Sequence, residues 1–141
     1  MNFENLVGKS VDKYNIEMML GQGGMGAVYK ALDIDLNRPV IIKVMSPALV
    51  NQTGYLERFR REAQMSANLK HPNIVTVYNF GVVDNLSYVV MQYLDGGSLD
   101  DLIRENAGRG LSVSDTVTWV SEIAAALDYA HSEGIVHRDV K

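Results

Sequence analysis

Apolar and polar residues alternate along the first third of the chain, with the two-residue period of half-buried β-strands. The alternation covers residues 14–20 and 28–32 and continues as a β-branched run over 40–45. A glycine-rich stretch at 21–26 and turn-forming residues at 33–39 separate these segments. The pattern predicts three antiparallel strands joined by hairpins. In the first of them, one face is expected to carry Tyr14, Ile16, Met18 and Leu20.

One helix and two more strands are predicted next. Residues 55–69 have helical composition, and Pro72 ends this helix because proline disfavours helical conformation in the residue before it. Two further apolar runs, 74–83 and 86–93, flank a turn at Asp84-Asn85. We therefore expect a five-stranded antiparallel sheet with one inserted helix.

The rest of the chain predicts helices. A glycine pair at 96–97 breaks the chain, and Ser98 is suited to cap a short helix. Residues 112–133 form a long helical pattern that ends at Gly134. Its stripe, at spacings of three and four, comprises Val117, Val120, Ala124, Leu127 and His131. The fold class is therefore α+β, with two parts that meet near residues 92–97.

Composition narrows the possible functions. The chain has 141 residues, of which 47% are apolar and 21% charged, and its formal net charge is −4. It contains no basic run, so we expect no nucleic-acid binding. It has no cysteine, which excludes disulfides and thiolate metal sites, and its three histidines are scattered. We expect a cytoplasmic domain without a signal peptide, a membrane segment or metal-binding residues.

The glycine-rich stretch is the first candidate site. Four glycines fall within six residues: Gly21, Gly23, Gly24 and Gly26. Such a run forms either a tight hairpin turn without a ligand or a cradle whose backbone N–H groups bind phosphate. The glycines alone favour neither interpretation.

Two further groups of polar residues are candidates for chemistry. Lys43 lies in the middle of the β-branched strand, where it faces either solvent or a partner. Glu62 shares a helical stripe with Phe59, so we expect it on the face that packs on the sheet, paired with Lys43. The alternative is a glutamate at the edge of the stripe, in water. His137 and Asp139 form either a structural hydrogen-bonded pair or a general base with its support.

Together these residues resemble the protein kinase family over residues 14–141. The glycine run is similar to the phosphate loop, and Val40-Ile41-Ile42-Lys43 stands where the family has V-A-I-K. Glu62 matches the glutamate of helix C, and residues 137–141, His-Arg-Asp-Val-Lys, match the start of the catalytic loop. The Gly-Gly-Met-Gly form of the glycine run resembles the bacterial serine/threonine branch.

The resemblance implies a domain organisation. Residues 1–13 would be a lead-in, and 14–91 a kinase N-lobe with a five-stranded sheet and helix C. Residues 92–97 would be the hinge, and 98–141 the start of a C-lobe. The implied activity is phosphoryl transfer from Mg²⁺-bound ATP to Ser or Thr of a protein substrate.

The resemblance also implies site residues. Asp139 would accept the substrate hydroxyl proton, Lys141 would reach the γ-phosphate, and Lys43 would hold the α- and β-phosphates. Arg138 would pair with a phosphorylated activation loop. The implied nucleotide-binding residues are Leu20, Gly21, Gly23, Gly24, Gly26, Val28, Ile41, Lys43, Glu62, Met91, Gln92, Leu94, Ser98 and Leu99. Of these, Gln92 and Leu94 would use only backbone groups. Ile41 replaces the usual alanine and is expected to crowd adenine.

The resemblance stops at Lys141, inside the catalytic loop. The loop asparagine and the D-F-G sequence, which hold both Mg²⁺ ions in the family, are absent from the 141 residues. We therefore expect an incomplete chain that is inactive alone. The alternatives are a non-catalytic nucleotide-binding fragment and an interaction module. The latter would self-associate through its long helix, whose apolar stripe faces a core that these residues do not encode.

Overall fold

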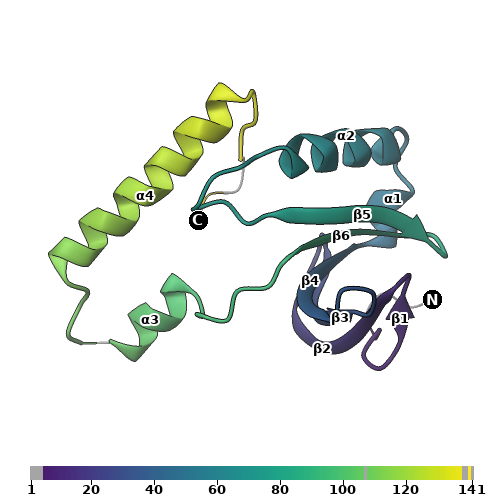
Figure 1. Ribbon diagram of the computed structural model, residues 1–141, viewed down its shortest axis with the longest axis horizontal. Helices are drawn as coiled ribbons and strands as arrows, with labels where there is room; N and C mark the ends of the chain where they lie inside the picture. Colours follow the sequence, from purple (N-terminus) through teal and green to yellow (C-terminus); the bar gives the residue numbers. More distant parts are fainter. Residues whose placement is uncertain (1–4, 107, 138–139, 141) are drawn as a thin grey trace. The chain divides into compact units, whose positions relative to one another are not determined.

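The computed structural model describes residues 5–106, 108–137 and 140. The chain divides into two compact units, and each is described by itself. The first unit comprises Met1–Asn68 and Val75–Tyr93, and the second comprises Leu69–Ile74 and Leu94–Lys141. All strands of the described residues lie in the first unit, and the two C-terminal helices lie in the second (Figure 1).

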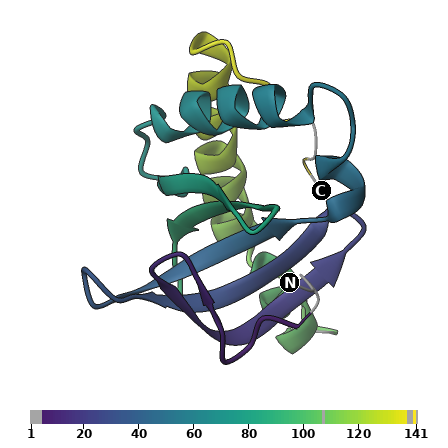
Figure 2. The ribbon, with the colours of Figure 1, turned by 90° about the vertical axis from the view of Figure 1, so that its right-hand side faces the viewer.

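The first unit is built on one antiparallel sheet (Figures 1 and 2). Its strands are β1 (Ser10–Val11), β2 (Tyr14–Gly23), β3 (Gly26–Asp33), β4 (Arg38–Met45), β5 (Val77–Val83) and β6 (Leu86–Gln92). Their spatial order is β1-β2-β3-β4-β6-β5. The neighbours β4 and β6 are not consecutive, because two helices and β5 lie between them in the chain.

The sheet has six strands in residues 5–106, one more than the five expected. β1 pairs with the start of β2, with Ser10 opposite Asn15 and Val11 opposite Tyr14. Leu6 and Val11 are 0% and 1% exposed, so part of the expected polar lead-in belongs to the core. A two-residue strand is too short to show an alternation, which is why the sequence pattern missed it.

β2 does not keep the single apolar face that its alternation predicts. Its register with β3 shifts between Ile16 and Met18 and again after Met19. Tyr14 and Ile16 are buried, whereas Met18 and Leu20 are about half exposed and Met19 packs against the core instead. The expectation of one shared face is wrong, because an irregularity of one residue moves the following side chains to the other face.

One face of the sheet carries the core of the first unit. Tyr29 of β3 lies opposite Ile42 of β4, and Ile42 lies opposite Val90 of β6. All three are 0% exposed, and each buried aliphatic or aromatic side chain stabilises the fold by about 1.5–3 kcal/mol. The same cluster contains Leu6, Val11, Tyr14, Ile16, Ala27, Ala31, Val40, Val44, Leu86 and Tyr88.

Two helices connect β4 to β5. α1 (Pro47–Val50) is a single turn, capped by the hydroxyl of Ser46. α2 (Tyr55–Ala67) lies along β5 in both views (Figures 1 and 2). The Phe59 ring of α2 meets Phe80 of β5 edge to face, with ring centroids 6.3 Å apart. This aromatic contact docks α2 on the sheet.

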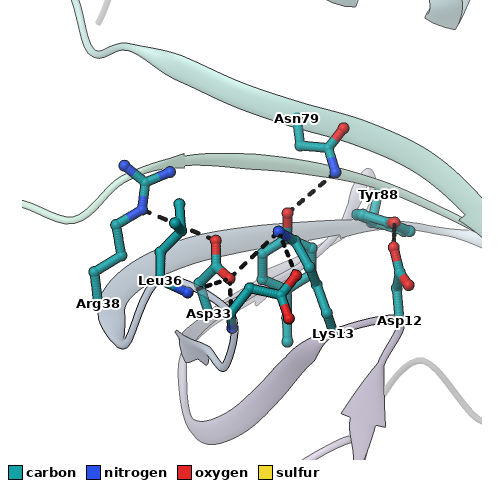
Figure 3. A network of polar contacts seen from close by, with 9 residues as sticks. Asp12, Lys13, Asp33, Leu36, Arg38, Asn79 and Tyr88 are labelled. Atoms are coloured by element: carbon teal, nitrogen blue, oxygen red, sulfur yellow. Dashed lines mark hydrogen bonds and ion pairs between the residues drawn. The ribbon is translucent and has the colours of Figure 1, made fainter.

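A polar network holds the N-terminal hairpin against the sheet (Figure 3). Asp33 is 2% exposed, and its carboxylate lies 3.4 Å from the Lys13 ammonium. The same carboxylate accepts two backbone N–H groups of the turn that follows it. Tyr88 of β6 donates a hydrogen bond of 2.8 Å to Asp12. These partners offset the cost of burying Asp33 and Tyr88.

The second unit contains α3 (Leu99–Glu105) and α4 (Val113–Ser132). The Ser112 hydroxyl caps α4, and Gly134 follows its end with a φ of 77°, so both predicted boundaries of the long helix are confirmed. No helix in the described part of the chain is both long and apolar enough to cross a bilayer.

The segment that precedes β5 is attached to α4 within the second unit. The Lys70 N–H donates to the Tyr129 hydroxyl at 3.1 Å, and the His71 ring stacks on Tyr129 with centroids 5.4 Å apart. The contact joins residues almost sixty positions apart and fixes the turn that Pro72 begins.

Candidate functional site

Gly26 is required by the fold itself. It begins β3 with a φ of 140°, a conformation that side chains rarely adopt. A Cβ there would overlap the carbonyl oxygen of Val44 and lie 3.0 Å from the Cα of Met45. The adjacent Met25 carbonyl accepts the Ser46 N–H at 3.2 Å, which holds the hairpin against the end of β4.

At the other three glycines of the run, no contact within the described chain requires a residue without a side chain. Gly21 and Gly23 belong to β2, and Gly24 lies in the turn. None of them has a positive φ, and a Cβ at each would meet no atom within 4 Å. The end of β2 and the turn after it therefore contain three positions without a side chain, where a phosphate can approach the backbone closely.

The sheet brings four of the expected nucleotide-binding residues to one face. Val28 lies opposite Lys43, and Ile41 lies opposite Met91. Side chains alternate between faces along a strand, so all four point away from the core face of Tyr29. They are neither buried nor fully exposed. We call Val28, Ile41, Lys43 and Met91 the open face of the sheet.

Glu62 does not occupy the expected position. It is exposed, whereas the sheet-facing residues of α2 are Phe59 and Ala63. Among the described residues, the ion pairs do not include one between Lys43 and Glu62. The buried face of α2 contains Phe59 and Ala63, and it does not extend to Glu62. The alternative of a glutamate in water describes this structure.

Ser98 has a local structural role in the second unit. Its hydroxyl donates to the Asp101 carboxylate at 2.6 Å and accepts the Asp101 N–H at 3.1 Å, which forms a capping box at the start of α3. The hydrogen bonds from the Ser98 hydroxyl and N–H lower the pKa of Asp101 below its ordinary value. The predicted helix cap at Ser98 is confirmed, and a ribose contact would compete with it.

The remaining expected residues are placed to different degrees. Gln92 ends β6, and its N–H donates to the Thr76 carbonyl at 2.9 Å. Leu94 and Leu99 are 58% and 44% exposed in the second unit. Of the expected catalytic residues, Lys43 is described, whereas Asp139 and Lys141 lie outside the described residues. Arg138, the expected partner of a phosphorylated loop, also lies outside them.

Sequence reasoning missed one cluster near the open face. The Lys30 ammonium lies 3.4 Å from the Glu17 carboxylate and 5.1 Å from the centre of the Tyr93 ring. The sequence offers no periodic signal for this contact, because Glu17 lies at the irregularity in β2 and Tyr93 follows the last residue of β6.

The residues present fit a nucleoside triphosphate better than a metal ion alone. The open glycine backbone and the Lys43 ammonium are groups that bind phosphate oxygens. By contrast, residues 5–106 and 108–137 contain no group of three or more His, Asp or Glu side chains placed to hold a metal ion. The described part of the site therefore offers groups of the kind that bind phosphate.

Comparison with known proteins identifies relatives of this chain. The family model for the protein kinase domain matches residues 14–141. Serine/threonine-protein kinase PknJ of Mycobacterium tuberculosis is 42% identical over 128 residues, and PrkC of Bacillus subtilis is 40% identical over 137 residues. The alignments cover 91% and 96% of this chain but 21% of each relative. The chain thus spans about a fifth of the length of these relatives.

The fold is also similar to that of solved kinase domains. The crystal structure of the M. tuberculosis PknI kinase domain superposes with a TM-score of 0.84 at 34% sequence identity. The superposition covers 95% of this chain and 53% of that domain. The expected resemblance to bacterial serine/threonine kinases is confirmed, and so is the expected fold class of an antiparallel sheet with one helix and the first helices of a second lobe.

Proposed function

Because the chain belongs to the protein kinase family, we propose that it supplies the ATP-binding part of a serine/threonine protein kinase domain. The reaction is the transfer of the γ-phosphoryl group of ATP to a Ser or Thr hydroxyl of a protein substrate. PknJ and PrkC are serine/threonine kinases, but the alignments cover only 21% of each, so nothing about their substrates or regulation is transferred to this chain.

One observation carries the proposal: Gly21, the first of the open glycines, and Lys43 share a row across the sheet. Gly21 lies opposite Val28, and Val28 lies opposite Lys43. The row therefore runs from the backbone of Gly21, which carries no side chain, past the apolar Val28 to the ammonium group of Lys43. Phosphates held at the glycine end would lie within the reach of a lysine side chain in the same row.

The individual roles are those that membership of the protein kinase family implies for these residues. Lys43 binds the α- and β-phosphates, Gly21, Gly23 and Gly24 hold the phosphates through backbone N–H groups, and Val28 and Ile41 contact adenine. Leu20, Met91 and Leu99 complete the apolar surroundings. The Gln92 carbonyl and the Leu94 N–H bind the edge of adenine, and Ser98 contacts ribose. Asp139 and Lys141 act on the transferred group.

Mg²⁺ neutralises charge on the phosphates when it is bound with ATP. The described residues include no cluster that holds it. We propose that a polypeptide of these 141 residues alone binds nucleotide weakly and transfers no phosphate.

Thermal unfolding with and without Mg-ATP tests the nucleotide-binding role. A ligand at ten times its dissociation constant stabilises the folded chain by about 1.4 kcal/mol, which raises the melting temperature of a domain this size by roughly 3–5 °C. We expect this rise for the unchanged chain and for Lys9→Ala, which removes an exposed lysine outside the site. Lys43→Ala should abolish it. Equal rises in all three would contradict the proposal.

The exposed face of α4 favours a second function, self-association. Val113, Val117, Val120 and Ile123 are 80%, 59%, 60% and 47% exposed. An apolar face of this kind typically binds another protein surface. Sedimentation of the 141-residue chain should show dimers or larger species, and Val117→Asp with Val120→Asp should reduce them. A single monomer species at all concentrations would exclude this function.

A further inference from the structure

Three side chains meet where the chain leaves the sheet, two from separate strands and one from the residue after β6. Lys30 belongs to β3, Glu17 belongs to β2, and Tyr93 directly follows β6. The Lys30 ammonium is 3.4 Å from the Glu17 carboxylate and 5.1 Å from the centre of the Tyr93 ring. In the sheet, β4 separates β3 from β6. The cluster therefore ties the end of β6 to strands that it does not adjoin.

The cluster lies on the open face. Lys30 is opposite Ile41, and Ile41 is opposite Met91, so Lys30 projects from the same face as both. Its side chain passes over β4 to reach the Tyr93 ring. The Glu17 carboxylate pairs with the same ammonium, which helps to hold the cation over the ring.

The backbone just before Tyr93 is also fixed. The Gln92 N–H donates to the carbonyl of Thr76, just before β5, at 2.9 Å. The chain is thus held at Gln92 by a backbone hydrogen bond and at Tyr93 by the contact of its ring with Lys30. Leu94, the next residue, is 58% exposed.

We propose that Glu17, Lys30 and Tyr93 form a positioning cluster that sets the backbone after β6 for the nucleotide base. The proposal rests on the proposed function, which assigns base contacts to the Gln92 carbonyl and the Leu94 N–H. Neither Lys30 nor Glu17 contacts the nucleotide in this role. Lys30 acts through the Tyr93 ring, and Glu17 acts through Lys30.

The expected effect is modest and selective. A cation over an aromatic ring and an ion pair that is partly exposed are each weak interactions, so loss of the Lys30 charge should weaken ATP binding about two- to fivefold. Binding of inorganic tripolyphosphate should not change, because that ligand has no base. A loss of general stability would weaken both ligands alike.

Isothermal titration of the 141-residue chain with Mg-ATP and with Mg-tripolyphosphate tests the proposal. Lys30→Met should weaken Mg-ATP only, whereas Lys30→Arg, which keeps the cation, should restore affinity. Lys9→Met is the matched control, since Lys9 is exposed and its ammonium donates to the Asn5 carbonyl near the N-terminus. Glu17→Gln is a second variant that disturbs the same cluster without changing Lys30. It is made at a side chain that is 44% exposed.

The outcomes separate the two proposals. Failure of the unchanged chain to bind Mg-ATP contradicts the proposed function and the positioning role with it. Normal Mg-ATP affinity in both Lys30→Met and Glu17→Gln overturns the positioning role alone. Equal weakening of both ligands also overturns it, because the effect would then lie in the phosphate site or in stability.

Discussion

Gly26 lies so close to Val44 that a side chain at Gly26 would overlap the Val44 carbonyl oxygen. The four glycines of the run therefore fall into two sets with different roles. Gly26 closes the hairpin against β4, and it has a structural reason to be glycine. Gly21, Gly23 and Gly24 have open surroundings, and a close ligand is the reason that the proposed function gives them.

Alanine substitutions test this division. Gly26→Ala forces a side chain into a backbone with a φ of 140° and into the Val44 carbonyl, so it should lower the free energy of unfolding by at least about 2 kcal/mol. Gly24→Ala is the matched control and should change it by less than about 0.5 kcal/mol. Urea unfolding measures both. Equal destabilisation would mean that Gly24 is also fixed by the fold.

The exposure of Glu62 predicts a small effect in the absence of nucleotide. Glu62→Gln removes a charge that no described ion pair uses, so the free energy of unfolding should stay within about 0.5 kcal/mol of its original value. Thermal unfolding without nucleotide is the measurement. A loss above 2 kcal/mol would indicate that Glu62 is paired in the free chain, as the sequence suggested.

The contact between α2 and β5 predicts a large effect at Phe59. Its ring is 7% exposed and meets Phe80, so Phe59→Ala should cost about 3–5 kcal/mol of stability. Leu56→Ala removes a side chain of the same helix that is 37% exposed, and it should cost less than 1.5 kcal/mol. Denaturant unfolding of both variants compares them. Similar losses would contradict the packing of α2 on β5.

Tyr88 makes stability depend on alkaline pH. Burial, and then the hydrogen bond that it donates to Asp12, raise the pKa of Tyr88 well above its ordinary value of 10. Since the pKa is raised in the folded chain, this stabilisation is complete below pH 10 and declines as the pH rises above that value. Tyr88→Phe should lower stability by about 1 kcal/mol at neutral pH and remove this part of the alkaline decline.

Melting curves between pH 8 and pH 11 check the prediction for Tyr88. Asn79 offers a control, because it donates to a different tyrosine, Tyr14, in the same network (Figure 3). Asn79→Ala should leave the slope of stability against pH above 10 unchanged. A Tyr88→Phe variant with the original slope would show that another group causes the alkaline loss.

The sequence predicted the elements whose patterns are long and regular. The helix at α4 was bounded correctly, because Ser112 and Gly134 supply cap residues at both ends. The strands β3, β4 and β6 follow from their alternation and β-branched residues. The four residues of the open face are on one side of the sheet because strand register, once fixed, determines the face of every side chain.

Features that depend on tertiary contacts could not be predicted. The irregularity in β2 moves Met18 and Leu20 to the other face, and no alternation signals a shift of one residue. The position of Glu62 depends on which face α2 turns to β5, and Ala63, a small residue, proved to be on that face. The contact of Lys30 with Tyr93 joins residues far apart in the chain, so it needs the folded sheet.

Amide hydrogen exchange of residues 21–26, measured with and without Mg-ATP, tests the central claim most directly. If the open glycines bind phosphate through their backbone, their N–H groups should exchange more slowly with Mg-ATP than without it. Lys43→Ala should abolish most of this protection. Unchanged exchange at residues 21–26 in the presence of bound Mg-ATP would contradict the claim that this run is a phosphate cradle.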